Sequence, residues 1–200
     1  EATDTLFAED VPPVKVTASA SDTNGDKIFD VVAILVNEEE TNNPTEVKFG
    51  TEVTVVASPV ECFEFLGWYD DADATLTTDM EYTFTAIDET IVLYALYEQY
   101  VHTLDATVVP VESGGEISVS SGVQDISLPA EIPCGSGVTL SATSENECWE
   151  FDGWYLEGVL WETEESTDVT VKKDLSLEAR FKKIKYDVTV SASPSDVAVL

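Results

Sequence analysis

The stretch Gly50-Thr-Glu-Val-Thr-Val-Val-Ala-Ser-Pro-Val-Glu-Cys-Phe-Glu-Phe-Leu-Gly-Trp-Tyr69 occurs a second time, in altered form, as Gly135-Ser-Gly-Val-Thr-Leu-Ser-Ala-Thr-Ser-Glu-Asn-Glu-Cys-Trp-Glu-Phe-Asp-Gly-Trp-Tyr155. Both copies hold an alternating Val and Thr segment, then a cysteine, then an aromatic run that ends in Gly-Trp-Tyr. Self-similarity of this kind is the signature of a tandem repeat. The sequence therefore predicts two copies of one structural module along the chain.

Alternation of apolar and polar residues predicts that each module is built of β-strands. Val14, Val16 and Ala18 alternate with polar residues, which is the pattern of a strand with one buried face. Almost no segment has helical periodicity. We expect an all-β, mainly antiparallel fold, with hairpin turns at Thr23–Asp26 and Ser113–Gly115.

The repeats divide the chain into four parts. We expect an extended leader at residues 1–13, a first module at 14–100, a second module at 101–185 and a last segment at 186–200. The last segment begins with the same alternating pattern as the first module. It therefore predicts a C-terminal extra strand, the first strand of a third repeat.

The aromatic run supplies the predicted core of each module. Phe65 and Trp68 in the first copy correspond to Phe151 and Trp154 in the second. Large aromatic side chains bury much apolar area. We expect these four residues to lie in two equivalent cores.

The charge of the chain excludes several classes of function. Forty acidic residues against nine basic ones give a net charge of −31, whereas nucleic acids and anionic membranes require a positive surface. A hydrophobic content of 44% favours a packed core over disorder. No apolar run approaches the ~20 residues of a membrane-spanning helix.

Six of the nine basic residues lie between Lys172 and Lys185. They form either the polar face of the last strand or a basic end that meets an acidic neighbour.

Both modules resemble a known family of repeats. The runs Phe65-Leu-Gly-Trp-Tyr69 and Phe151-Asp-Gly-Trp-Tyr155, each followed by a final strand like Ile91–Tyr97, are similar to bacterial surface repeats of the divergent internalin B-repeat type. The resemblance extends from Val14 to Phe181. It implies small β-rich modules, β-grasp-like or sandwich-like, that are strung as stalks or adhesins outside the cell. It implies no catalytic residue.

One acidic stretch has the spacing of a calcium loop. Oxygen-bearing side chains occupy positions 1, 3, 5 and 9 of that motif: Asp22, Asn24, Asp26 and Asp30. However, Lys27 takes the place of the usual glycine and Ala33 that of the bidentate acid. A hairpin turn explains the stretch without a metal, so calcium is the alternative and no other cofactor is expected.

The sequence offers little for catalysis. His102 is the single histidine, so no second histidine is available for a nucleophile and base arrangement. We expect no enzymatic activity. Trp149 and Trp161 lack tryptophan counterparts in the other module, and exposed aromatic faces at these two positions would suit a glycan partner.

The three cysteines can form one disulfide bond within the chain, for which we consider two pairings. Cys134 and Cys148 would close a short loop within the second module, and this pairing is the one we favour. A hairpin in that region would place the two cysteines too far apart. A bond between Cys62 and Cys134 is then the competing choice.

These features predict an extracellular structural protein, a stalk or a head-to-tail homopolymer on or outside the cell surface. Assembly would use strand addition by the last segment, whose apolar positions are Val188, Val190, Ala192, Val197, Val199 and Leu200. The alternatives are a frayed tail of a longer stalk, or an adhesin that binds a glycan or another cell-surface partner.

Overall fold

The computed structural model describes residues 11–190, and the chain forms two compact units. Unit 1 runs to His102 and also includes Pro133–Gly135, whereas unit 2 comprises Thr103–Ile132 and the chain from Ser136 onward. Within the described residues all regular structure is β-strand apart from one 3-10 turn, η1 (Val111–Ser113). The expected all-β, mainly antiparallel fold is confirmed.

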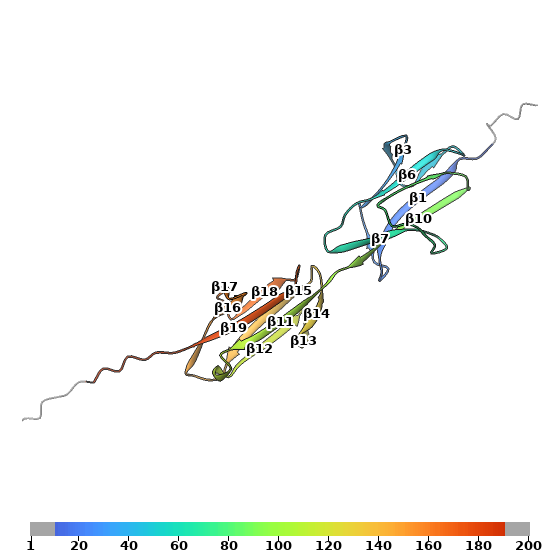
Figure 1. Ribbon diagram of the computed structural model, residues 1–200. Helices are drawn as coiled ribbons and strands as arrows, with labels where there is room; N and C mark the ends of the chain where they lie inside the picture. The colour runs from blue at the N-terminus through green and yellow to red at the C-terminus, as the bar shows by residue number, and fades with distance from the viewer. Residues whose placement is uncertain (1–10, 191–200) are drawn as a thin grey trace, which may run out of the picture. The chain divides into compact units, whose positions relative to one another are not determined.

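Unit 1 consists of two sheets (Figure 1). The first has the order β2-β1-β10-β7-β8, with β5 also paired to β1, and the second has the order β4-β3-β6-β9. The strands are β1 (Val14–Asp22), β2 (Lys27–Ile28), β3 (Val32–Val36), β4 (Glu39–Thr41), β5 (Thr45–Val47), β6 (Glu52–Ala57), β7 (Phe63–Asp70), β8 (Thr75–Thr77), β9 (Glu81–Thr85) and β10 (Thr90–Gln99).

Unit 2 repeats this plan, with the sheets β14-β11-β19-β16-β17 and β13-β12-β15-β18. Its strands are β11 (Val101–Val109), β12 (Gly115–Ser121), β13 (Gln124–Ile126), β14 (Ala130–Pro133), β15 (Gly137–Ser144), β16 (Trp149–Leu156), β17 (Val159–Glu162), β18 (Ser166–Thr170) and β19 (Leu175–Lys183). Each strand of unit 2 has a counterpart in unit 1, where β2 is the additional strand.

The first and last strands of each unit pair in parallel. Lys15 to Asp22 of β1 lie beside Thr90 to Tyr97 of β10, and Leu104 to Val109 of β11 lie beside Leu175 to Arg180 of β19. The other strand pairs with a determined register are antiparallel. Because the two strands run the same way, the chain enters a unit at one end of this pair and leaves it at the other.

The two sheets of each unit enclose one core, so the units are sandwich-like. The core of unit 1 joins residues of β1, β7 and β10 to residues of β3 and β6, and the core of unit 2 joins the equivalent strands. Trp68 and Trp154 are fully buried, as expected. Phe65 and Phe151 are partly buried and pack against them, with ring centroids 6.3 and 5.8 Å apart.

The glycine of each Gly-Trp-Tyr run has a steric role. Gly67 and Gly153 both have φ of +148°, at irregularities in β7 and β16. A Cβ atom at Gly67 would lie 2.5 Å from the Thr77 carbonyl oxygen, and one at Gly153 would lie 2.9 Å from that of Glu162. Glycine is therefore needed for β8 and β17 to approach so closely.

The hairpin turn predicted at Thr23–Asp26 is formed, because β2 pairs antiparallel with β1 across it, whereas the hairpin predicted at Ser113–Gly115 is wrong. After Asp26 only the short β2 pairs with β1, and the chain then passes to the other sheet, where β3 pairs with β6. Asp30, at φ of 59°, separates β2 from β3. In unit 2 the turn at Ser113–Gly115 leads from β11 in one sheet to β12 in the other, through η1.

The expected extra strand at 186–200 is not formed in its described part. Residues 186–190 have no strand pairing, and residues 191–200 lie outside the described residues. The leader is likewise described only at residues 11–13, which are irregular.

The two buried tryptophans differ in one hydrogen bond, which gives a stability prediction. Trp68 Nε1 donates to the Met80 carbonyl at 3.0 Å, whereas Trp154 Nε1 is buried without a hydrogen-bond partner among residues 11–190. Trp68→Phe should therefore lower the free energy of unfolding of its unit by roughly 1–3 kcal/mol more than Trp154→Phe lowers that of the other unit. Native-state hydrogen exchange, followed on peptides of each unit, measures both losses, and equal losses would contradict the prediction.

Candidate functional site

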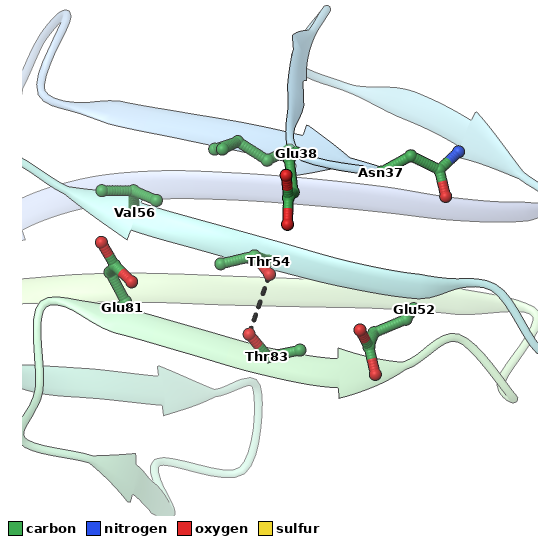
Figure 2. A pocket seen from close by; sticks show the side chains of 8 residues that line it. Asn37, Glu38, Glu52, Thr54, Val56, Glu81 and Thr83 are labelled. Carbon is green, nitrogen blue, oxygen red and sulfur yellow. Dashed lines mark hydrogen bonds between the residues drawn. The ribbon is translucent and has the colours of Figure 1, made fainter.

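A shallow depression of about 600 Å³ lies on the outer face of the second sheet of unit 1 (Figure 2). Its lining residues come from β3, β6, β9 and the turn after β3: Leu35, Asn37, Glu38, Glu52, Thr54, Val56, Glu81 and Thr83. At its centre the hydroxyls of Thr54 and Thr83 are 2.8 Å apart across β6 and β9. The depression is acidic, because its lining includes three glutamates and no basic side chain.

The equivalent face of unit 2 has the same kind of cross-strand pairs. Thr139 Oγ1 donates to Asp168 Oδ1 at 2.6 Å, and the hydroxyls of Ser141 and Ser166 are 2.8 Å apart. These exposed pairs join β15 to β18 as Thr54 and Thr83 join β6 to β9. Their repetition in both units indicates a role in sheet stability.

Among residues 11–190, no three His, Cys, Asp or Glu side chains come together in a way that could hold a metal ion. In the calcium-like stretch, Asp22 is buried and its Oδ1 accepts hydrogen bonds from the backbone N–H groups of Asn24 and Asp26, both at 2.9 Å. Asp70 makes the same contacts with Ala72 and Ala74. This use of an aspartate to close a turn accounts for the spacing that resembles a calcium loop.

A network of charged side chains lies across β16 and β19. Lys182 Nζ is 3.1 Å from Asp152 Oδ1 and 3.6 Å from Glu150 Oε1, while the Tyr155 hydroxyl donates to Asp152 Oδ2 at 3.0 Å. The hydrogen bonds from Lys182 and then Tyr155 lower the pKa of the Asp152 carboxyl below its ordinary value. The same contacts with Asp152 raise the pKa of Tyr155 and of Lys182.

Arg180 extends this network. Its Nε and Nη2 donate to Glu178 Oε2 at 2.8 and 2.6 Å, and its guanidinium carbon lies 4.0 Å from the centroid of the Tyr155 ring. Two of the basic residues between Lys172 and Lys185 therefore contact acids on their own sheet. Contacts of this kind are those expected of a polar face on the last strand.

A disulfide bond joins Cys62 to Cys134, with the two Cα atoms 5.2 Å apart and a separation of 72 positions in sequence. The favoured Cys134–Cys148 pairing is therefore wrong, and Cys148 is a free, exposed cysteine. The reason is that residues 133–135 belong to unit 1. There Cys134 N–H donates to the Tyr100 carbonyl at 2.8 Å, and Gln99 Nε2 donates to the Cys134 carbonyl at 2.8 Å.

The glycan-binding candidates lie apart on unit 2. Trp149 begins β16 and is partly buried against the core, with Lys183 Nζ 5.4 Å from its ring centroid. Trp161 lies in β17, whose pairing with β16 is confined to Trp154–Leu156. Five residues of strand, or about 16 Å, therefore separate the two positions along β16.

Trp161 belongs to an exposed apolar segment. Val159, Leu160 and Trp161 are 69%, 47% and 40% exposed, and β17 is an edge strand of its sheet. The sequence analysis missed this segment, although three consecutive apolar residues after Glu157-Gly158 were the available signal.

Of the candidate assembly residues, only Val188 and Val190 lie within the described part of the chain. Their side chains are 83% and 87% exposed. Ala192, Val197, Val199 and Leu200 lie outside the described residues. In residues 11–190 there is also no helix long and apolar enough to cross a membrane.

Known proteins similar to this chain include both curated relatives and solved structures. Two relatives from Evansella cellulosilytica, named "Putative Gly-rich membrane protein" and "Putative membrane protein", are each 30% identical, over 149 and 173 residues. These matches cover 74% and 86% of this chain but 16% and 22% of the relatives. The chain thus spans about a fifth of the length of the curated relatives it matches.

Three solved structures of low identity also match. The Bacillus anthracis TIE protein has a TM-score of 0.48 at 13% identity, over 87% of this chain and 34% of that one. A C-terminal fragment of the pilus adhesin SpaC from Lactobacillus rhamnosus GG has a TM-score of 0.45 at 9% identity, over 88% and 100%. The major pilin T-13 from Streptococcus pyogenes has a TM-score of 0.39 at 9% identity, over 87% and 98%.

The family model described as "Divergent InlB B-repeat domain" matches the chain twice, at residues 36–100 and 106–185. One match falls on each of the two repeats, and together they cover most of the chain. The resemblance expected from the two Gly-Trp-Tyr runs is confirmed, and the chain belongs to the divergent InlB B-repeat domain family.

Proposed function

We propose that this chain is part of a bacterial cell-surface stalk, in which tandem B-repeats act as spacers that resist tension. The observation that carries this proposal is the parallel pairing of the first and last strands inside each unit, β1 with β10 and β11 with β19. The family is one of repeats, and a repeat that enters at one end of a strand pair and leaves at the other suits a linear array.

Parallel terminal strands have a mechanical consequence. Tension applied to the chain on either side of unit 1 pulls β1 and β10 along their common axis in opposite directions. Their bridging hydrogen bonds, spread over eight residue pairs, then share the load together. A force that peels the same strands apart would break these bonds one after another.

The Cys62–Cys134 bond supports the same proposal. With this bond closed, a pull on the ends of the chain bypasses the segment between the two cysteines, which are 72 residues apart. With the bond closed, the pulling force leaves unit 1 at Cys62. Cys62 lies at the C-terminal end of β10, because Tyr100 N–H donates to the Cys62 carbonyl at 2.9 Å. The disulfide therefore limits extension. With the bond closed, β10 and β11 lie within the bypassed segment, and β1 is still loaded along its own axis through its pairing with β10.

Single-molecule force spectroscopy tests the proposal by changing the direction of pull. Handles at the two ends of the chain shear β1 along the sheet. A handle before Val14 combined with one at Asp88, next to the start of β10, peels β1 from β10, because Lys15 N–H bonds to the Glu89 carbonyl. Unit 1 should unfold at a higher force in the first pull than in the second, because the hydrogen bonds between β1 and β10 then break together rather than in turn.

The same chain serves as its own control, because only the attachment point differs between the two measurements. Exposed Asp88 can carry an azide-bearing residue, which leaves the cysteines untouched. Equal unfolding forces in both directions would remove the argument for a tension-resisting spacer.

Strand addition is a finer form of assembly, and the exposure of Val188 and Val190 favours it. In this form, the segment Asp187–Leu200 of one copy completes a sheet of the next copy, and copies join head to tail. Deleting residues 187–200 should then abolish polymers seen by electron microscopy while both units stay folded. A chain shortened instead by residues 1–10 is the control, and identical filaments from the 187–200 deletion would contradict strand addition.

Glycan binding is the alternative function, and the exposed apolar segment Val159–Trp161 favours it. This alternative predicts that the protein binds arrayed glycans and that Trp161→Ala weakens the binding about tenfold or more. Trp149→Ala is the comparison, because Trp149 packs partly against the core and should affect stability as well. A native protein that retains no glycan would dismiss this function.

A further inference from the structure

The free Cys148 occupies the same place in the second repeat as the disulfide-bonded Cys62 in the first. Each cysteine precedes the aromatic strand, β7 or β16, and its carbonyl accepts a backbone hydrogen bond at 2.9 Å from the residue after the last strand. The donor is Tyr100 for Cys62 and Ile184 for Cys148. The following residue also bonds back into the turn in both cases, from Phe63 N to Val60 O and from Trp149 N to Asn146 O.

The partner of Cys62 comes from the repeat that follows in sequence. Cys134 lies between β14 and β15, and its N–H donates to the carbonyl of Tyr100, the same residue whose N–H bonds to Cys62. Tyr100, which directly follows the last strand of unit 1, is therefore hydrogen-bonded to both cysteines of the disulfide. In the second repeat, Ile184 stands at that position and already bonds to Cys148.

A second observation concerns the apolar side chains that follow Ile184. Val188 corresponds to Leu104, which is fully buried in unit 2, and yet Val188 is 83% exposed. Val190 corresponds to the partly buried Ala106 and is 87% exposed. Apolar side chains that a repeat normally buries against its own sheets are thus uncovered directly after Ile184.

We propose that Cys148 is the covalent attachment point for a further B-repeat, through a disulfide bond to the cysteine in that repeat's turn equivalent to Pro133–Gly135. The two thiols lose two protons and two electrons to form the bond, and a small-molecule disulfide such as oxidised glutathione is reduced to two thiols. The step proceeds by attack of the Cys148 thiolate on that disulfide and then of the second thiolate on the Cys148 sulfur.

Two differences between the sites define what this bond requires. Cys62 has a left-handed backbone, with φ of 71°, and Cys148 does not, so its turn must adjust when the bond closes. Phe49 stands at the Cys134 position in the first repeat, so only repeats that carry cysteine there can be joined.

The test extends the full chain by one repeat of known cysteine content. A second copy of residues 103–190 is joined after Tyr186, which continues the natural spacing because Tyr186 corresponds to His102. After refolding in a glutathione redox buffer, peptide mapping without reduction should find the original Cys148 linked to the copy of Cys134. Labelling of Cys148 by a maleimide should fall about tenfold relative to the unextended chain.

Cys148→Ser at the original position in the extended chain is the matched control, and it should leave the copy of Cys134 free and reactive. A separate arm asks whether the repeat can come from another molecule. The native protein, with free Cys148, is mixed with the double variant Cys62→Ser, Cys148→Ser, whose only thiol is Cys134. A linked pair in this arm supports attachment between chains, and a link in the extended chain supports attachment along one chain.

The outcome that overturns the proposal is a Cys148 that stays equally reactive in both arms. The mixed arm does not depend on the folding of an added copy, because neither partner in it is extended. Cys62–Cys134 should remain intact in the extended chain, which peptide mapping reads in the same experiment.

Discussion

A whole indole buried between two small sheets is the constraint on which each unit depends. Trp68 and Trp154 are fully buried, and a neighbouring ring meets each edge to face. Units of this size bury limited apolar area, so one such side chain is a large part of the core. The glycine before each tryptophan completes the constraint, because only glycine allows β8 and β17 to lie against the strand that presents the indole.

The sequence predicted the strands well where their pattern is local. In β1 the burial alternates residue by residue as the apolar and polar side chains do. The same pattern does not say which sheet a strand joins, because one buried face is satisfied in either sheet. This is why the sequence does not show where the strand after Asp26 leaves β1: only β2 returns along β1, whereas β3 pairs with β6 in the opposite sheet. The left-handed Asp30 that separates β2 from β3 has no distinctive signal in the sequence.

The disulfide was mispredicted for a related reason. Two hydrogen bonds hold Cys134 in unit 1. Its backbone N–H donates to the Tyr100 carbonyl, and its carbonyl accepts from the Gln99 side chain. Backbone hydrogen bonds can be made by almost any residue, so no residue type marks the place where the chain returns. The available signal was that Cys134 has no cysteine counterpart in the first repeat. The network around Lys182 was predictable only in part from the sequence. Its acidic partners, Glu150 and Asp152, depend on the register of β16 against β19, which shifts between Phe151 and Gly153.

The acidity of the chain limits how one repeat can hold a segment of the next. With a net charge of −31, and with Arg180 and Lys182 engaged by acids on their own sheet, like charges dominate the surface and oppose close approach. Salt screens this repulsion only beyond about 10 Å at 0.1 M ionic strength. A segment such as Pro133–Gly135 is therefore best held by interactions that need no opposite charge. The structure uses a covalent bond and neutral hydrogen bonds there, and their strength does not depend on the charge of either repeat.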